Sequence, residues 1–475
     1  MKICLINHNE RYAVCEIAMA YFPHTKFEDV SEIPQCGDYI ISKLEESNGT
    51  YSYITVLSFG GITETNTVKS LEYNKTYFKQ SFHNIAKTLV GGFLPWGVLT
   101  GIRPGKIARE LMENGMDKDA VKKHFLTHYL TEERKAALAI EVAENEMKIL
   151  KGMDKNAVSL YVGIPFCPTR CLYCSFTSQS IKFTSKFVEP YLEALYKEIE
   201  YTASKLKETP YHIETVYIGG GTPTSLTFQQ LDGLIRKLYE EFDLSLIKEF
   251  SVEAGRPDTI TPEKLKVLKN NGVTRISINP QTINDETLKI IGRSHSSTDF
   301  LKSYELACKS GFTNINTDII AGLPGEGREE FLRTLNCIKE LNPANVTVHT
   351  MSIKRSSFLA QDYDMYTVAE ASAVNDMLDC AYDTMKSLGK IPYYMYRQKN
   401  MLGNLENVGY CNEGCENLYN IYIMEEVQSI IALGAGASTK IVKGDEINRV
   451  FNVKDVYEYI TRHDEMLKRK NWIFD

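Results

Sequence analysis

The pattern of hydrophobic and polar positions changes along the 475-residue chain. Residues 1–130 combine β-type apolar runs, ICLIN and YSYITVLSFG, with an amphipathic stretch near residues 75–90. Short apolar or alternating runs indicate strands, whereas a helical period indicates a helix. These residues therefore predict a small N-terminal α+β domain. The next run, TEERKAALAIEVAENEMKILKG, is rich in strong helix formers and places Ala137 and Ile140 on one side, which predicts a linker helix within residues 131–156.

From Ser159 onward, short β-branched or apolar runs alternate with amphipathic stretches such as residues 187–206 and 365–388. Repeated strand–helix units predict an α/β fold with a parallel sheet. Six units favour a partial (β/α)6 barrel over residues 157–389 rather than a closed eight-fold barrel. The strand candidates are SLYVGI, ETVYIG, EFSVEA, TRISIN, NINTDII and ANVTVHT. Residues 390–475 are less regular and predict a C-terminal accessory segment that closes the active site.

Composition limits the classes of protein that the chain can belong to. Hydrophobic residues make up 43% and charged residues 24%, as in a soluble globular protein. The net charge of -7 argues against a nucleic-acid partner, because such proteins need a basic surface. No apolar stretch is long enough for a membrane span. The 11 cysteines are odd in number and unevenly spread, which favours a reducing compartment, so a cytoplasmic location is expected.

Three cysteines directly follow the first predicted barrel strand. The run YVGIPFCPTRCLYCSF places Cys167, Cys171 and Cys174 at CxxxCxxC spacing, and three thiolates without a fourth suit a 4Fe-4S cubane with one open iron. One alternative is three buried structural thiols, which the neighbouring proline, threonine and arginine disfavour because they describe an exposed loop. The other is zinc, which usually takes a fourth ligand or includes histidine or carboxylate, and no histidine lies near this loop.

This loop resembles the cluster-binding motif of the radical S-adenosylmethionine (SAM) superfamily. More narrowly, the chain resembles the anaerobic coproporphyrinogen III dehydrogenase family, most closely its HemZ-type branch. The similarity covers about residues 157–450 and includes YVGIPFC, GGGTPT, SVEAGRPD, RISINPQTINDETLKIIGR and NTDIIAGLPGE. The N-terminal run WGVLTGIRPGKIAREL also resembles this branch. The resemblance implies two cofactors, a 4Fe-4S cluster on the three cysteines and S-adenosyl-L-methionine.

The same resemblance implies which residues surround the SAM. They are Tyr161, Phe176, Gly220, Gly221, Thr222, Glu253, Gln281, Arg293 and Asp318. Glu253 and Tyr161 are expected to be catalytic, and the glycines would let backbone amides approach a bound group. Simpler explanations stay open, namely a tight turn for the glycines, a rim salt bridge for Glu253 and core packing for Tyr161. The run GAGAS at residues 434–438 resembles a family segment near the active site, and a glycine-rich turn is its alternative.

The implied activity is oxygen-independent oxidative decarboxylation of coproporphyrinogen III to protoporphyrinogen IX by a 5′-deoxyadenosyl radical, a step of haem biosynthesis. A reducing partner such as flavodoxin or ferredoxin is the expected electron donor. The substrate carboxylates need basic partners, for each of which a solvated surface position is the alternative. The candidates are Arg256, Arg293, Lys354, Arg355 and Arg397.

One departure from the family pattern leaves the function open. Phe176 stands where the best-known oxidase branch has a further cysteine, two places after the third ligand. A haem chaperone of the same family also lacks that cysteine, so a haem chaperone and a radical SAM enzyme acting on haem are alternatives. INPQT and the N-terminal region favour the dehydrogenase. Cys411 and Cys415 form an isolated pair, which we expect to be structural.

Overall fold

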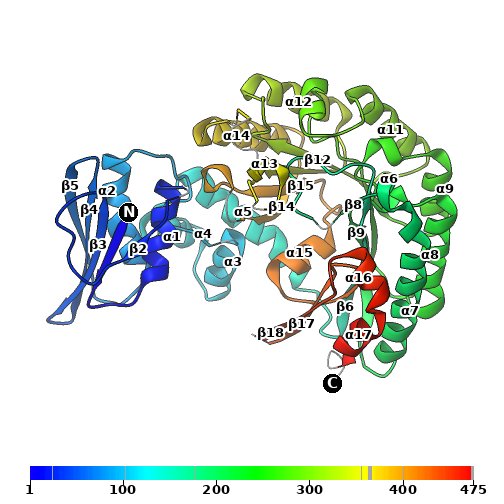
Figure 1. Cartoon of the computed structure of the whole chain (residues 1–475), viewed down its shortest axis with the longest axis horizontal. Helices are drawn as coiled ribbons and strands as arrows, with labels where there is room; N and C mark the ends of the chain where they lie inside the picture. Colours follow the sequence, from blue (N-terminus) through cyan, green and yellow to red (C-terminus); the bar gives the residue numbers. More distant parts are fainter. Residues whose placement is uncertain are drawn as a thin grey trace. The chain divides into compact units, whose positions relative to one another are not determined.

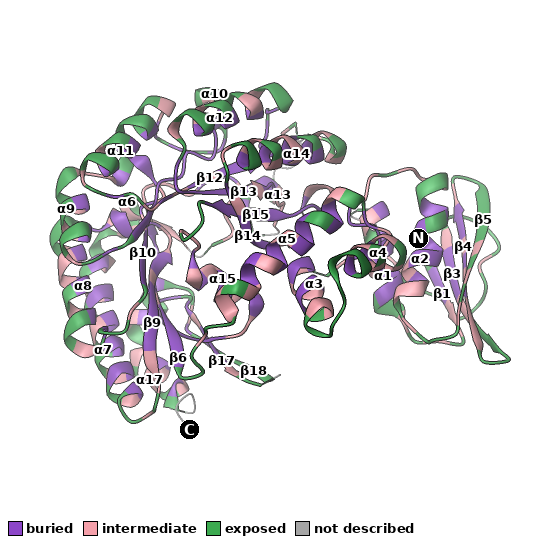
Figure 2. Cartoon of the chain, turned by 180° about the vertical axis from the view of Figure 1, so that it is seen from behind, coloured by how far each residue is buried: buried purple, intermediate pink, exposed green. Residues whose placement is uncertain are grey.

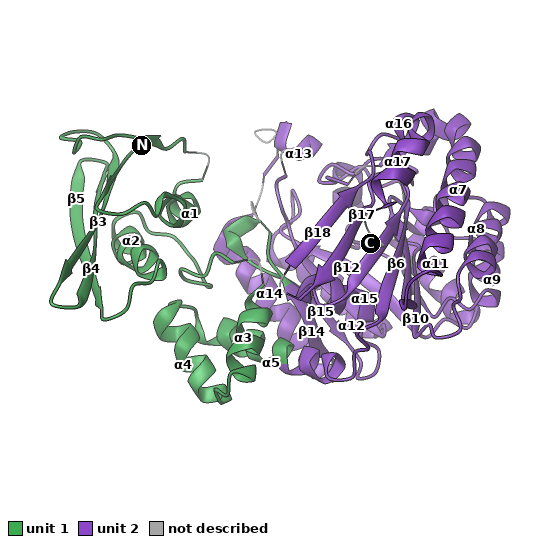
Figure 3. Ribbon diagram, turned by 90° about the horizontal axis from the view of Figure 1, so that it is seen from below, with its two compact units in different colours: residues 1–143, 396–406 green, residues 144–395, 407–475 purple. Residues whose placement is uncertain are grey.

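The protein is described by a computed structural model that divides into two compact units (Figure 3). Unit 1 comprises residues 1–143 and 396–406, and unit 2 comprises residues 144–395 and 407–475. The residues that the structure describes are 1–23, 25–101, 103–176, 178–354, 356–361, 366–367, 369–398, 401–444 and 446–471. The expected linker helix is α5 (Glu133–Leu150), which begins in unit 1 and ends in unit 2. The four-part division expected from the sequence remains a prediction.

Unit 1 contains a five-stranded sheet in the order β2-β1-β3-β4-β5. Its strands are β1 (Lys2–Ile6), β2 (Glu28–Asp29), β3 (Tyr39–Ser47), β4 (Thr50–Phe59) and β5 (Ile62–Ser70). Its helices are α1 (Arg11–Tyr21), α2 (Thr76–Leu89), α3 (Pro104–Glu113) and α4 (Lys118–His128). Ile17, Tyr53 and Phe78 are buried in one hydrophobic core formed by α1, the sheet and α2. The two apolar runs and the helix expected from the sequence are confirmed.

Unit 2 contains the predicted parallel sheet. All six expected strands are present, and each pairs in parallel with the next one along the chain (Figure 1). They are β6 (Ala157–Ile164), β9 (His212–Gly220), β10 (Glu249–Glu253), β11 (Arg275–Ser277), β12 (Ile315–Ala321) and β13 (Asn345–Thr350). Parallel neighbours require crossover connections, and helices supply them. The carboxyl ends of the six strands therefore meet at one edge, which is where ligands bind in such folds.

Amphipathic helices cover the outer face of this sheet. They are α7 (Val188–Leu206), α8 (Phe228–Glu241), α9 (Pro262–Asn270), α10 (Asp285–Ile290), α11 (Ser297–Lys309), α12 (Arg328–Leu341) and α14 (Ala371–Ser387). Their buried stripes face the strands and their exposed stripes face outward (Figure 2). The helix expected over 365–388 begins at Ala371, and residue 365 lies outside the described residues. None of the described helices is long and apolar enough to cross a bilayer.

The C-terminal residues extend the same sheet instead of forming a separate one. The complete order is β14-β15-β13-β12-β11-β10-β9-β6-β16-β17-β18. The added strands are β14 (Ile391–Tyr396), β15 (Asn407–Cys411), β16 (Ser429–Leu433), β17 (Ser438–Lys443) and β18 (Glu446–Phe451). Three helices accompany them, α15 (Leu418–Glu425), α16 (Val456–Thr461) and α17 (His463–Arg469). Because β16 is parallel to β6, its carboxyl end lies at the edge where the cysteine loop begins.

Candidate active site

The three cysteines lie on one loop at the carboxyl end of β6. Inside it, the two-residue strand β7 (Phe166–Cys167) pairs with β8 (Gln179–Ser180). The loop is closed by a hydrogen bond from the Cys174 amide to the Cys171 carbonyl at 3.1 Å. The Leu172 amide donates to the carbonyl of Ile291 at 3.0 Å, which fixes the loop against the chain that follows α10. The spacing read from the sequence thus places three thiols on a held loop at a strand end.

The thiols have few partners and lie close enough to affect one another. Burial raises the pKa of Cys167 and Cys174, and repulsion between the loop's thiolates contributes to both shifts. The Thr222 hydroxyl donates to Cys167 Sγ at 3.3 Å, and Arg256 Nη1 lies 3.8 Å from Cys171 Sγ. The thiolate is the form of cysteine that binds metal. Three cysteines with no fourth thiol on the loop therefore fit a cluster with one open iron.

Among the described residues, no three histidine, cysteine, aspartate or glutamate side chains are grouped to hold a single metal ion. A single ion needs its ligands grouped around one point, whereas the ligands of a four-iron cubane bind different irons and stand farther apart. The grouping therefore gives no support to mononuclear zinc at the cysteine loop.

The glycine run at residues 219–221, with the Thr222 that follows it, holds the cysteine loop. The Gly221 amide donates to the Ile164 carbonyl at 2.8 Å, and the Thr222 amide donates to the Phe166 carbonyl at 2.7 Å. A Cβ on Gly221 would lie 3.0 Å from Cys167 Sγ, so only glycine permits this approach. These two amides are therefore occupied within the protein. Contact between Gly220, Gly221 or Thr222 and a cofactor remains a prediction.

Two carboxylates face the barrel interior in different states. The Tyr217 hydroxyl donates to Glu253 Oε1 at 2.6 Å, yet burial and the nearby charge of Asp318 raise the pKa of Glu253 to about 7. Burial also acts to raise the pKa of Asp318, but hydrogen bonds from His349 and Asn316 outweigh it and lower that pKa. Near neutral pH, Asp318 is thus ionised, whereas the protonated and the ionised forms of Glu253 are both populated.

Gln281 and Arg293 contain buried polar atoms without partners. Gln281 has a φ of 66°, a left-handed conformation that costs energy in a residue with a Cβ and is common at functional sites. Its Oε1 accepts no hydrogen bond from any described residue. Arg293 Nη1 donates to the Asn279 carbonyl at 2.8 Å, whereas its Nε is unpartnered within the same described set. Unsatisfied buried atoms are costly, so they indicate a missing polar group at this edge.

Tyr161 belongs to a stack of three tyrosines. Its ring lies 6.2 Å from those of Tyr217 and Tyr419, which are 4.5 Å from each other. Tyr161 and Tyr217 are register partners on β6 and β9, Tyr419 comes from α15, and the Tyr217 hydroxyl connects the stack to Glu253. Core packing and cofactor contact are both compatible with this position, so the catalytic assignment of Tyr161 stays a prediction.

Tyr217, His349 and Tyr419 were missed by the sequence reasoning, and Tyr173 was noted in the cysteine motif but given no contact. Tyr217 could have been found by strand alternation, because it lies two positions before Gly219 and so on the same face. Tyr173, whose hydroxyl accepts a hydrogen bond from Arg293 at 3.4 Å, is itself part of the cysteine motif. His349, 3.6 Å from Asp318 Oδ2, and Tyr419 carry no pattern that marks them in the sequence.

The expected substrate arginines are largely engaged in the fold. Arg256 binds both oxygens of Asp258, at 3.0 and 3.1 Å, and also the Thr169 hydroxyl. Arg397 lies in unit 1 and donates to the backbone carbonyls of Asn404 and Gly101, so its expected role toward a carboxylate is unsupported. Arg355 lies outside the described residues.

Two cations of the prediction remain. Lys354 Nζ lies 5.9 Å from the centre of the Phe176 ring. Lys354 is also close enough to Cys174 for a thiolate there to act to raise the pKa of the lysine. Phe176 itself is 67% exposed, so its place in the cofactor shell stays a prediction. Arg293, as described above, keeps one free donor at the site.

The GAGAS run connects β16 to β17 beside β6. A Cβ on Gly434 would lie 2.5 Å from the Gly163 carbonyl oxygen, so glycine is required for this close approach. The Tyr191 hydroxyl accepts the Ala435 amide at 3.2 Å and donates to the Gly163 carbonyl. The run therefore lies at the edge where the cysteine loop begins, as expected, and it acts as a packing turn there.

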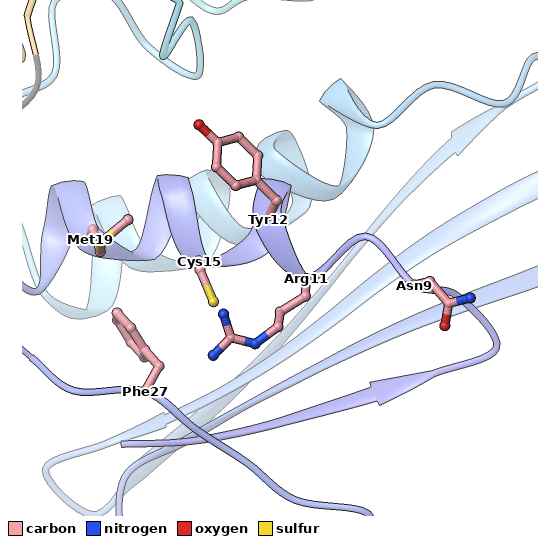
Figure 4. Close-up of a pocket in the computed structure, with 6 residues that line it drawn as sticks. All are labelled: Asn9, Arg11, Tyr12, Cys15, Met19 and Phe27. Carbon is pink, nitrogen blue, oxygen red and sulfur yellow. The ribbon is translucent and has the colours of Figure 1, made fainter.

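A hollow in unit 1 is lined by Asn9, Arg11, Tyr12, Cys15, Met19 and Phe27 (Figure 4). Arg11 is committed to both oxygens of Asp29 at 2.7 Å, and burial raises the pKa of Cys15. A paired cation and a protonated thiol offer no evident chemistry. We assign this hollow no role.

Comparisons with known proteins agree with this geometry. The model of the radical SAM superfamily matches residues 161–338. The chain is 38% identical over 474 residues to the oxygen-independent coproporphyrinogen-III oxidase-like protein HemZ of Bacillus subtilis (strain 168), covering 98% of this chain and 94% of that protein. It is 30% identical to the heme chaperone HemW of Lactococcus lactis subsp. lactis, over 66% of this chain and 79% of that protein.

A solved structure is similar as well. The coproporphyrinogen III oxidase HemN of Escherichia coli, described as a radical SAM enzyme, superposes with a TM-score of 0.53 at 25% identity, covering 68% of this chain and 73% of that one. The partial barrel predicted from the sequence is thereby confirmed as a radical SAM fold.

Proposed function

The chain belongs to the family of HemZ-like, coproporphyrinogen-III oxidase-like radical SAM proteins, and from this membership we propose that it converts coproporphyrinogen III oxidatively to protoporphyrinogen IX. The family's cofactors are a 4Fe-4S cluster and S-adenosylmethionine. When bound, they supply a carbon radical that abstracts an unactivated hydrogen, and the protein supplies position, electrostatics and exclusion of water.

The observation that carries the proposal is the polar edge beside the cysteine loop. Cys167, Cys171 and Cys174 would hold the cluster. Glu253 ends β10 and Gln281 follows β11 at the same carboxyl edge of the sheet. The unpartnered Gln281 Oε1 and the singly bonded Glu253 would accept hydrogen bonds from SAM. A carboxyl with a pKa near 7 can receive an ammonium group by releasing its proton, so Glu253 suits the amino group of the methionine moiety.

Asp318 complements Glu253 in this arrangement. Asn279 Nδ2 and Asn316 Nδ2 hold its two oxygens at 2.8 and 2.7 Å, and it stays ionised at neutral pH. An ionised, fixed carboxylate is suited to accept hydrogen bonds from neutral hydroxyl groups. We assign it to the ribose end of SAM.

The substrate's carboxylates would meet the remaining cations. Lys354, beside the last cysteine, donates no hydrogen bond within the described residues. Burial lowers its pKa, and a negatively charged partner would reverse that shift. It is the cation that we expect to hold a propionate. The proposed compartment is the cytoplasm, because an oxygen-sensitive cluster and 11 cysteines without disulfides require reducing conditions.

The test is an anaerobic incubation of reconstituted protein with coproporphyrinogen III, SAM and dithionite, followed by mass spectrometry. Carbon dioxide, 5′-deoxyadenosine and protoporphyrinogen IX should form in step. Glu253→Ala should keep the cluster and lose all three products. SAM cleavage without any change to coproporphyrinogen III would contradict the proposed substrate.

A second function has its own support. The similarity to the heme chaperone HemW covers 66% of the chain, and Phe176 replaces the cysteine of the oxidase branch. A haem chaperone would bind haem in an ultraviolet–visible titration and form no protoporphyrinogen in the incubation above. Methylated or linearised tetrapyrrole among the products would instead identify a radical enzyme acting on haem.

A further inference from the structure

The outer side of the cysteine loop carries positive charge in an acidic protein. Between residues 167 and 188 the chain has three basic residues, Arg170, Lys182 and Lys186, and no aspartate or glutamate, although the whole chain has a net charge of -7. Lys182 and Lys186 are exposed, and among the described residues neither forms an ion pair. The nearest carboxylate in sequence, Glu189, accepts a hydrogen bond from Gln230 at 2.5 Å. The carboxylate of Asp455 reaches this segment from α16's N-terminal side and is engaged by Gln179 Nε2 at 3.0 Å.

Exposed aromatic rings accompany these lysines. The two most exposed phenylalanines of the described chain are Phe183, at 78%, and Phe176, at 67%. Lys182 Nζ lies 6.0 Å from the centre of the Phe183 ring, and Lys186 Nζ lies 5.0 Å from that of Phe187. Large apolar side chains rimmed by charge mark interaction sites on soluble proteins. We call Phe176, Lys182, Phe183 and Lys186 the loop patch.

The loop patch is continuous with the cysteine ligands. Ser180 is the strand-register partner of Cys167, and its hydroxyl donates to the Pro168 carbonyl at 3.1 Å. The short helix α6 (Ile181–Thr184) begins at the next residue and carries Lys182 and Phe183. A molecule seated on the loop patch is therefore separated from the cysteine loop by one short strand pair.

We infer that the loop patch is the docking surface for an acidic one-electron-donor protein, an inference that rests on the proposed function. One electron passes from the reduced donor to the oxidised cluster, the donor is oxidised by one electron, and no bond or proton is exchanged. Electron transfer needs proximity to the metal site, and the patch supplies it. Electrostatic complementarity between exposed lysines and donor carboxylates speeds encounter without requiring a large interface.

Two other occupants fit less well. A tetrapyrrole would need a walled site that excludes water, which rings exposed by 67% and 78% do not provide. An anionic membrane surface would be attracted by the lysines but would gain nothing from their closeness to the cluster ligands. Both alternatives become outcomes of the test.

The experiment compares Lys182→Glu/Lys186→Glu with the matched control Lys266→Glu/Lys302→Glu, which places the same charge change on exposed lysines of α9 and α11. Binding of the reconstituted protein to an acidic flavodoxin is measured by calorimetry at several salt concentrations. The rate of SAM cleavage is measured with reduced flavodoxin and, separately, with dithionite.

The loop variant should bind flavodoxin about tenfold more weakly at low salt, with a smaller salt dependence, and its flavodoxin-driven rate should fall to match. Its dithionite-driven rate and its Michaelis constant for coproporphyrinogen III should equal those of the control. Equal flavodoxin affinity in both variants would overturn the inference, as would a loss confined to anionic vesicles or to the tetrapyrrole. SAM cleavage needs no tetrapyrrole, so a failure of the proposed substrate leaves this result readable.

Discussion

Two glutamates of unit 2 show how a structural carboxylate differs from a functional one. Glu198 on α7 is fully buried and accepts hydrogen bonds from four groups. These are Lys470 Nζ at 2.6 Å, Asn452 Nδ2 at 2.7 Å, the Gly434 amide at 2.8 Å and the Tyr459 hydroxyl. Burial acts to raise the pKa of Glu198, but Lys470 and these bonds outweigh it and lower that pKa.

Glu253 at the end of β10 is partly buried and receives, among the described residues, one hydrogen bond, from Tyr217. Burial is not offset there, and the pKa of Glu253 rises to about 7. The same contrast holds for the neighbouring Gln281 and Arg293, which have unpartnered atoms. The comparison teaches that complete hydrogen bonding marks the part of the barrel edge that maintains the fold. At Glu253, Gln281 and Arg293, incomplete hydrogen bonding at the strand ends leaves polar atoms that a cofactor could satisfy.

The largest expected effect comes from removing a cluster ligand. Cys171→Ala should abolish cluster binding in reconstituted protein, because a cubane held by two thiolates loses a ligand that nothing else on the loop replaces. Iron and sulfide analysis measures it. The fold should survive, as seen by unchanged circular dichroism. Full iron content in the variant would contradict the three-cysteine site.

Breaking the hydrogen-bond network around Glu198 should affect the stability of the fold instead. Lys470→Met leaves Glu198 buried without its cation and should lower the free energy of unfolding by about 3 to 5 kcal/mol, measured by urea denaturation. Lys470→Met combined with Glu198→Gln should recover part of that loss. A single variant as stable as the parent would show that the network is not structural.

Replacing Glu253, which lacks such a network, should increase the stability of the fold. The folded-state pKa of Glu253 lies near 7, above its ordinary value of 4.5, so the folded protein binds more protons than the unfolded one between these values. Stability contributed by this residue is therefore lost as pH rises from 4.5 to 7. Glu253→Gln should stabilise the cluster-free protein by about 3 kcal/mol at pH 8 and by little at pH 4.

Thermal melts of the parent and of Glu253→Gln across this pH range check the prediction. The variant should also lose SAM binding. An equal stability difference at pH 4 and pH 8 would show that the carboxyl does not titrate in this window.

The smallest effect is expected from the cysteines outside the loop. Cys411→Ser with Cys415→Ser should leave the iron content unchanged, because the buried Cys411 and the half-buried Cys415 lie near Lys390 and have no third described thiol beside them. Iron analysis of the double variant beside the parent measures it. A drop in iron would reveal an auxiliary cluster.

The barrel and its cysteine loop were predictable because local patterns determine them. Each of the six parallel strands is a short apolar run, and the ligand spacing is continuous in sequence. The expected face of α5 is right at Ile140 and Ala143, which are buried, and wrong at Ala137, which is exposed between the buried Ala136 and Ala139. Small residues on both sides of a helix leave the period ambiguous.

Contacts between distant segments could not be predicted. Glu198 meets Lys470 across 272 positions, and Tyr419 joins the tyrosine stack from α15. No pattern in the sequence links such residues, because only the folded sheet and the helices packed on it bring them together. The extension of the sheet by β16 and β15 was missed for the same reason.

The most direct test of the account is electron paramagnetic resonance of the anaerobically reconstituted, dithionite-reduced protein with and without SAM. The account predicts about four irons per chain and a cluster signal that changes when SAM is added. In Glu253→Ala the same cluster signal should appear and should not respond to SAM. Stoichiometric zinc without sulfide, or a cluster signal that SAM leaves unchanged in the parent protein, would contradict it.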